Sequence, residues 1–129
     1  MVGIVLVSHS LKLAEGVKEL ASQMVTEVLI AAAGGTEDGR IGTDMNKIIR
    51  AIKEVYSKDG VIVIFDLGSA YMNSDMAIES LPEIMKDKVE IIDTAFVEGA
   101  VVAAIQCSLG KNIKEIKSEL KSMCLHKIQ

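Results

Sequence analysis

The sequence predicts an α/β fold: a single domain over residues 1–129 with a parallel sheet of about four strands, in the order 2-1-3-4, and helices on both faces. Short continuous apolar runs alternate four times with stretches of helical periodicity, which is typical of a parallel sheet that is covered on both sides. A chain of 129 residues, half of them hydrophobic, is also long enough to bury a core without disulfides or a structural metal.

The first half of the chain supplies two of the expected strands and two helices. Residues 4–7 are apolar and mostly β-branched, which is typical of a strand that is buried on both faces. A helix with one apolar stripe is expected next; the stripe is Leu13, Val17, Leu20 and Met24. Residues 28–33 predict a second strand, and a loop with four glycines follows it. Thr43 is then placed to cap the second helix.

The second half repeats this alternation and closes with an extra helix. Residues 61–65 predict the third strand, and the turn at residues 66–69 leads into a helix that Pro82 ends or interrupts. Residues 89–92 predict the fourth strand. Residues 95–106 predict a helix that is apolar nearly all round, as in a core helix or a dimer face. The last helix has an apolar stripe of Ile113, Ile116, Leu120 and Met123.

Charge and composition exclude several classes of partner. Fourteen basic and eighteen acidic residues give a net charge of −4, which argues against nucleic acid and against an anionic membrane surface. The longest apolar run, residues 100–105, is too short to cross a bilayer, and the amino terminus lacks the basic start of a signal peptide. The two cysteines are expected to be free thiols, so the sequence predicts a cytoplasmic protein.

Polar side chains that could take part in binding or catalysis follow the first and third strands. In a parallel sheet of order 2-1-3-4, ligands bind between these strands, beyond their carboxyl ends. Ser8-His9-Ser10 follows the first strand, and Asp66-Leu67-Gly68-Ser69 follows the third. The turn at residues 34–36 borders the same rim. An imidazole, a carboxylate and several hydroxyls are therefore expected in one crevice.

Elimination leaves His9 as the reacting group. The first strand-to-helix turn has no glycine for a dinucleotide, the chain has no phosphate-binding P-loop, and no second histidine is placed to activate a serine. A free imidazole has a pKa of about 6.5, so much of it is unprotonated and nucleophilic near neutral pH. Asp66 could fix its tautomer, and the helix starts near Ser10 and Ser69 could receive phosphoryl oxygens. We expect no lysine, arginine or metal close to this group.

Four segments together resemble the mannose-type phosphotransferase-system IIA family, and within it the branch that serves phosphoenolpyruvate-dependent dihydroxyacetone kinase. The first segment is residues 5–10, with the Ser-His-Ser motif, together with residues 13–16; the others are residues 41–44, 66–70 and 97–99. The third-strand loop lacks the double glycine and proline of the sugar-transporting branch.

The resemblance implies the roles of the residues and the partners. It implies that His9 is phosphorylated on Nε2, that Asp66 is its acidic partner and that phosphorylated HPr is the donor. The acceptor would be ADP held by the subunit DhaL, and the resulting ATP would phosphorylate dihydroxyacetone on DhaK. Members of the family are homodimers. Because the chain ends after the IIA-like domain, we expect it to use a separate HPr.

Turns and helix caps near His9 supply the other residues of the predicted site. Residues expected to contact the phosphoryl group, by position in turns and caps, are Ser10, Gly35, Thr36, Gly68 and Ser69. No metal or cofactor is expected. Two other functions stay open: a IIA component of a mannose-type sugar transporter, and a non-catalytic α/β regulatory module that binds a small ligand.

Overall fold

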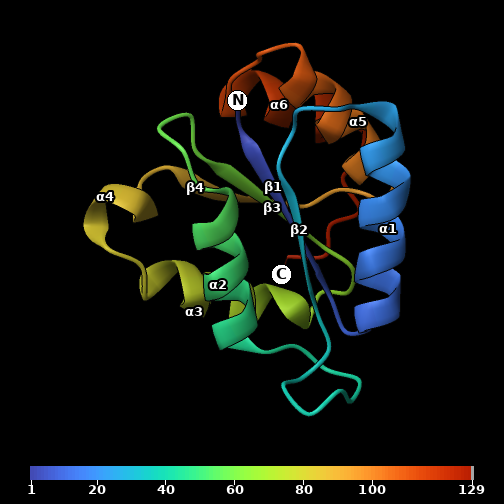
Figure 1. Cartoon of the computed structure of the whole chain (residues 1–129), viewed down its shortest axis with the longest axis vertical. Coiled ribbons are helices and arrows are strands. Elements are labelled where there is room, and N and C mark those ends of the chain that lie inside the picture. Colours follow the sequence, from blue (N-terminus) through green and yellow to red (C-terminus); the bar gives the residue numbers. More distant parts are fainter. Residues whose placement is uncertain (129) are drawn as a thin grey trace.

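The computed structural model describes residues 1–128 and contains one four-stranded, all-parallel sheet in the order β2-β1-β3-β4 (Figure 1). The strands are β1 (Gly3–Ser8), β2 (Ile30–Gly34), β3 (Val61–Phe65) and β4 (Val89–Ile92). The predicted fold class and strand order are therefore confirmed. The second strand starts two residues later than predicted and ends one residue later.

Helices cover both faces of the sheet, as predicted. They are α1 (Leu11–Met24), α2 (Met45–Val55), α3 (Ala70–Glu79), α4 (Glu83–Lys86), α5 (Phe96–Ser108) and α6 (Ile113–Leu120), with a short 3-10 helix, η1 (Lys121–Met123), after α6. Helices α2 and α3 pack on one face, and α1, α5 and α6 pack on the other (Figure 1). Pro82 separates α3 from the short α4 and so interrupts the helix where the sequence predicts it.

The position of β1 inside the sheet, covered on both faces, explains why its sequence is continuously apolar. Val5 and Val7 belong to the core under α2 and α3, whereas Ile4 and Leu6 belong to the core under α1 and α5. Alternate side chains of a strand point to opposite faces, so a strand covered on both sides has no solvent-facing positions.

Helix α1 buries a different stripe from the predicted one. The residues that face the core are Ala14, Val17 and Ala21. The prediction was wrong for three large side chains, which are 42–53% exposed: Leu13, Leu20 and Met24. The helix lies so close to the sheet that a Cβ built on Gly34 would come within 2.7 Å of the Cα of Leu11. Small side chains suit such a close approach, and the leucines turn outward.

The cap of α2 differs from the predicted one by one residue. Asp44, not Thr43, is the N-cap, and its Oδ1 accepts a hydrogen bond of 3.1 Å from the backbone N–H of Lys47. A carboxylate at this position also interacts favourably with the positive end of the helix dipole. The hydroxyl of Thr43 instead accepts a hydrogen bond of 2.6 Å from the Asn73 side chain, which links the start of α2 to α3.

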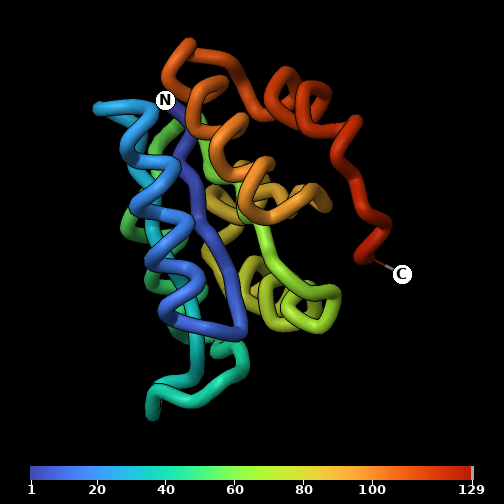
Figure 2. The backbone as a smooth tube through the Cα atoms, turned by 90° about the vertical axis from the view of Figure 1, so that its right-hand side faces the viewer, coloured from blue at the N-terminus to red at the C-terminus, as the bar shows by residue number. Residues whose placement is uncertain are grey.

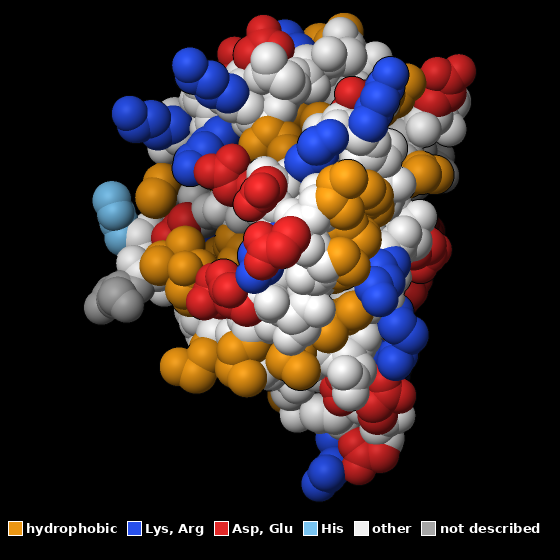
Figure 3. Space-filling view, turned by 90° about the vertical axis from the view of Figure 1, so that its left-hand side faces the viewer, with side chains coloured by type: hydrophobic (Ala, Val, Ile, Leu, Met, Phe, Trp, Pro, Cys, Tyr) orange, Lys and Arg blue, Asp and Glu red, His pale blue; other side chains and the backbone are white. Residues whose placement is uncertain are grey.

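The surface mixes charged and apolar side chains, and apolar ones gather in small patches between the charged ones on the side shown in Figure 3. After η1 the chain leaves the helical layer and descends along the molecule towards the turn that opens α3 (Figure 2). No helix within residues 1–128 has the length and apolar character needed to cross a membrane.

Candidate active site

The two central strands bring His9 and Asp66 together. β1 and β3 are paired neighbours, with Val7 opposite Phe65, and both strands end at the same edge of the sheet. His9 follows the last residue of β1, and Asp66 follows the last residue of β3. The two side chains therefore meet where the strand order reverses, as the sequence predicts.

The carboxylate of Asp66 lies at the centre of four hydrogen bonds. Its Oδ2 accepts from the hydroxyl of Ser8 at 2.8 Å and from the backbone N–H of His9 at 3.0 Å. Its Oδ1 accepts from the backbone N–H of Leu67 at 2.6 Å and lies 3.0 Å from Nδ1 of the His9 ring. The two oxygens are thus held in a fixed orientation by groups from both strand ends.

These contacts keep Asp66 ionised. The side chain is only 10% exposed, and burial raises the pKa of the Asp66 carboxyl because a charge is poorly solvated there. The four hydrogen bonds favour the charged form and outweigh burial, so the pKa of Asp66 lies below its usual value. Asp66 is therefore an anionic acceptor at neutral pH.

An ionised carboxylate fixes the tautomer of the neutral His9 ring. The carboxylate can only accept, so the ring proton is assigned to Nδ1, which donates to Asp66. Nε2 is then unprotonated, and its lone pair accepts a hydrogen bond from the hydroxyl of Ser69, 2.7 Å away. The His9 side chain is 20% exposed, so solvent reaches part of the ring. The arrangement presents Nε2 as a nucleophile to a group that approaches from outside.

Two helices begin beside this ring. Ser10 is the N-cap of α1, and its Oγ accepts a hydrogen bond of 3.2 Å from the backbone N–H of Leu13. Ser69 is the N-cap of α3 but makes no side-chain cap, because its hydroxyl faces the His9 ring. The amino ends of both helices add partial positive charge near His9, which suits an anionic group.

The three other residues predicted to contact the phosphoryl group lie in the surrounding turns. Gly35, with a φ of 70°, donates its backbone N–H to the carbonyl oxygen of Ser8 at 3.2 Å. Thr36 uses its hydroxyl within its own loop, where it contacts Asp38 and accepts from the Arg40 backbone. Gly68 lies against the C-terminal segment. A phosphoryl contact by any of these residues stays a prediction.

Two residues that hold the site together were missing from the predicted site residues. Ser8 is fully buried and connects the two halves of the site, because it donates to Asp66 and accepts from the backbone N–H of Ser10 at 3.0 Å. Its signal was a hydroxyl at the end of an otherwise apolar strand. The second residue is Lys127, whose Nζ lies 3.1 Å from the carbonyl oxygen of Asp66. The expectation that no lysine lies close to the site was therefore wrong.

The two cysteines form no disulfide, and the described residues hold no cluster of metal ligands. Cys107 is buried, which raises the pKa of its thiol to about 12, and both Cys107 and Cys124 are free. In the part of the chain that the structure describes, no three His, Cys, Asp or Glu side chains cluster in a way that could hold a metal ion.

Comparison with known proteins places this site in a family. Residues 3–117 match the EIIA-man family model, described as the PTS system fructose IIA component. A solved structure of a protein of unknown function superposes with a TM-score of 0.83 and 36% identity, and the match covers 95% of each chain.

Two bacterial relatives match along nearly the whole of both chains. One is the phosphotransferase subunit DhaM of a PTS-dependent dihydroxyacetone kinase from Lactococcus lactis, 37% identical over 97% of this chain and 98% of the relative. The other is the phosphoryl donor subunit DhaM of PEP-dependent dihydroxyacetone kinase 2 from Listeria innocua, 37% identical over 95% and 99%. The chain therefore belongs to the EIIA-man family of the phosphotransferase system and, within it, to the DhaM-type subunits.

Proposed function

We propose that this chain is the phosphoryl donor subunit of a dihydroxyacetone kinase and that Nε2 of His9 carries the phosphoryl group between two proteins. The donor is the phosphohistidine of HPr, and the acceptor is ADP bound to DhaL. The ATP formed there phosphorylates dihydroxyacetone on DhaK. Membership of the DhaM-type subunits supports the overall role, and the geometry of His9 supports the atom.

In the first transfer, the lone pair of His9 Nε2 attacks the phosphorus of phosphorylated HPr. The new N–P bond forms as the bond to the HPr imidazole breaks, and the electrons of that bond return to the HPr ring. Positive charge develops on the His9 ring, and the Asp66 carboxylate beside Nδ1 stabilises it. The hydroxyl of Ser69 must leave Nε2 at this step and is then close enough to donate to a phosphoryl oxygen.

In the second transfer, a terminal oxygen of ADP attacks the same phosphorus and the bond to Nε2 breaks. The His9 ring takes back the bonding electrons and returns to the neutral form with its proton on Nδ1. Asp66 stays ionised throughout, so it needs no proton from solvent in either direction. A carrier must both gain and lose its phosphoryl group. A ring that begins and ends the cycle neutral, with its proton on Nδ1, suits that requirement.

One observation carries the proposal: the carboxylate of Asp66 holds Nδ1 at 3.0 Å, while Nε2 meets the hydroxyl of the exposed Ser69 at 2.7 Å. If the proton were on Nε2 instead of Nδ1, Nε2 would have no lone pair with which to attack phosphorus. Position and tautomer together favour a phosphoryl carrier over a module that only binds a ligand.

Intact-mass measurement tests the proposal. We expect the wild-type chain to gain one acid-labile phosphoryl group when it is incubated with phosphoenolpyruvate, enzyme I and HPr. His9→Ala should gain none, whereas the matched control His126→Ala, which alters the other of the two histidines, should gain it normally. Absence of any gain in the wild type would refute the proposal.

The acceptor is tested separately by discharge of the phosphorylated chain. Added DhaL with bound ADP should remove the phosphoryl group and yield ATP. Discharge to a IIB protein of a sugar transporter instead would assign the chain to the sugar-transporting branch.

We also propose that the chain works in the cytoplasm as a homodimer. Several large apolar side chains on the outer faces of the helices are 38–71% exposed and could be covered by a second copy: Leu13, Leu20, Met72, Met76, Val97 and Ile105. Light scattering should then give about twice the 13.9 kDa of one chain, and a monomer at micromolar concentration would contradict this part.

A further inference from the structure

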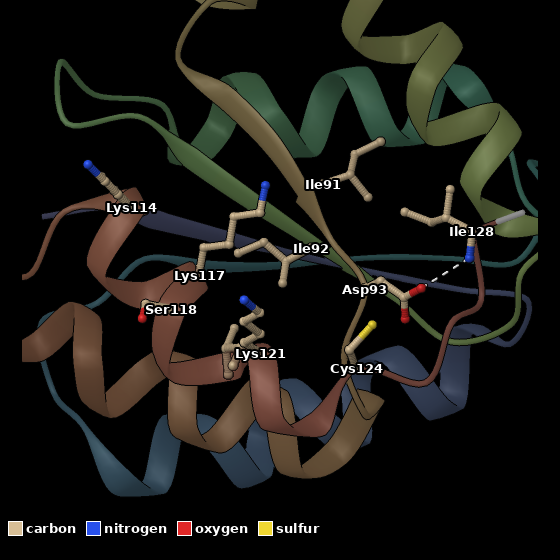
Figure 4. Close-up of a pocket in the computed structure, with 10 residues that line it drawn as sticks. Ile91, Ile92, Asp93, Lys114, Lys117, Ser118, Lys121, Cys124 and Ile128 are labelled. Atoms are coloured by element: carbon tan, nitrogen blue, oxygen red, sulfur yellow. Dashed lines mark hydrogen bonds between the residues drawn. The ribbon is translucent and has the colours of Figure 1, made fainter.

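The C-terminal segment runs past the active end of the sheet. After η1 it turns back towards the loop that carries Asp66 (Figure 2). Asp93, directly after β4, holds it there, because its Oδ2 accepts from the backbone N–H of Lys127 at 2.5 Å and from that of Ile128 at 3.0 Å. The second of these bonds is drawn in Figure 4. The segment is thus fixed at the backbone, one residue beyond the edge strand.

This attachment places the ammonium group of Lys127 under the active-site loop. Its Nζ donates to the carbonyl oxygens of Phe65 at 2.6 Å, of Thr94 at 2.7 Å and of Asp66 at 3.1 Å. It also lies 4.5 Å from the centroid of the Phe65 ring. An ammonium group has three protons to donate, and these three carbonyls use them all. Lys127 is therefore committed to the protein backbone and is not available to bind the phosphoryl group.

The position of Lys127 is unusual for a lysine. Burial lowers the pKa of the Lys127 ammonium, although the nearby charges of Asp93 and Asp66 act in the opposite direction. Lysine is rarely withdrawn from water unless other groups compensate for the lost hydration. Here the compensation comes from the carbonyls at the ends of β3 and β4, which the lysine joins.

The backbone of the segment also touches the loop. A Cβ built on Gly68 would come within 2.8 Å of the carbonyl oxygen of Lys127, so the two main chains are in direct contact. Gly68 lies between Asp66, which orients the His9 ring, and Ser69, whose hydroxyl contacts Nε2. Lys127 therefore holds the loop at residues 65–69, which contacts both nitrogens of the His9 ring.

We propose that Lys127 is a positioning residue for phosphoryl transfer, which acts through the loop at residues 65–69. Two of its hydrogen bonds hold the backbone carbonyls of Phe65 and Asp66, and the third ties them to Thr94. The backbone held in this way aims the Asp66 carboxylate at Nδ1 of His9. This inference rests on the proposed function of His9, since only a nucleophilic Nε2 requires a fixed tautomer. Because three backbone carbonyls use the protons of the Lys127 ammonium, the proposed role requires no contact between Lys127 and the phosphoryl group.

Lys127→Met tests the role, because methionine keeps an unbranched side chain and removes the three donors. We expect a roughly tenfold lower rate constant for transfer from phosphorylated HPr at saturation, since small displacements of reacting groups are costly. The apparent KM for phosphorylated HPr should stay the same, because Lys127 lies under the loop. Lys127→Arg, which keeps charge and donors, should restore part of the rate. The matched control Lys121→Met removes an exposed ammonium of the same C-terminal region and should change neither constant.

A spectroscopic readout separates positioning from a loss of stability. The 15N chemical shifts of the neutral His9 ring report which nitrogen carries the proton. We expect a predominantly Nδ1-protonated ring in the wild type and in Lys121→Met, and an increased share of the other tautomer in Lys127→Met. An unchanged tautomer together with an unchanged rate, or a rise in KM alone, would overturn the proposal.

A second variant covers the case in which Lys127→Met does not fold. Asp93→Asn weakens the backbone anchor of the segment but leaves the ammonium group in place, and it should shift the tautomer in the same direction; an unshifted ring would overturn the proposal. The tautomer measurement needs no donor protein, so a wild-type chain that accepts no phosphoryl group refutes the proposed function without deciding the role of Lys127.

Discussion

At the scale of the residue, two strand ends supply different parts of the site: His9 follows β1 and Asp66 follows β3. The sequence could predict His9 and Asp66, because each directly follows an apolar run and their chemistry is complementary. It could not predict that the hydroxyl of Ser8 donates to the carboxylate of Asp66, since that contact depends on the register between β1 and β3. Lys127 was missed for a similar reason: it is 61 residues from Asp66 in the chain, and only the path of the C-terminal segment brings them together.

Asp66→Asn should slow phosphoryl transfer strongly while the fold is retained. The carboxylate accepts four hydrogen bonds. An amide NH2 in place of either oxygen would face N–H or O–H donors, and it cannot accept a hydrogen bond from them. If the NH2 faces the His9 ring, Nδ1 becomes the acceptor and Nε2 carries the proton. We expect the rate of transfer from phosphorylated HPr to fall by roughly 100-fold or more, by analogy with other histidines that lose an orienting carboxylate.

Rapid-quench measurement of that transfer checks the expectation, with far-UV circular dichroism to confirm the fold. Ser69→Ala is the informative comparison, because it removes the contact to Nε2 and leaves the tautomer under the control of Asp66. It should slow transfer much less. Equal rates for wild type and Asp66→Asn would contradict the role that we assign to the carboxylate.

At the scale of the element, small residues decide how closely helices approach the sheet. The apolar stripe of leucines suggested the wrong buried face for α1, because hydrophobicity alone does not show how much space the helix has. Helix α5 follows the same rule: its buried face is composed of Gly99, Ala100, Ala103, Ala104 and Cys107. Strands and helix existence were predictable from periodicity, whereas the rotation of these helices depends on close contacts that periodicity does not encode.

Gly34→Ala should destabilise the fold and disturb the start of α1. The new Cβ would lie 2.6 Å from the carbonyl oxygen of Ser10 and 2.7 Å from the Cα of Leu11, and neither backbone atom can move without displacing the helix. We expect a loss of about 1–3 kcal/mol in the free energy of unfolding, as for other overpacked sites.

The same substitution at Gly16 provides the control. Gly16 is exposed within α1, and a Cβ there would meet nothing within 4 Å, so Gly16→Ala should gain about 0.5–1 kcal/mol from helix propensity. Urea unfolding of both variants measures the difference. A Gly34→Ala variant as stable as the wild type would show that α1 is not held at the distance described.

At the scale of the whole molecule, the order β2-β1-β3-β4 is the property that creates the site. It brings the ends of β1 and β3 side by side, and it places α1 and α3 so that both begin next to the His9 ring. The alternation of strands and helices made this topology predictable, and the position of the His9–Asp66 pair followed from it. The C-terminal segment was not predictable in this way, because it has no periodic pattern and its path is set by single contacts to Asp93.

The same arrangement leads us to expect phosphoryl transfer that needs no metal ion. We expect backbone N–H groups at the starts of α1 and α3 and the hydroxyl of Ser69 to meet phosphoryl oxygens, and Asp66 to balance the charge on the His9 ring. Within residues 1–128, no three His, Cys, Asp or Glu side chains cluster in a way that could hold a metal ion. Transfer from purified phosphorylated HPr, freed of enzyme I and its magnesium, should therefore proceed at the same rate in excess EDTA. A rate that falls with EDTA and recovers when Mg²⁺ is added back would mean that the cation supplies charge which we assign to the helix ends and to Ser69.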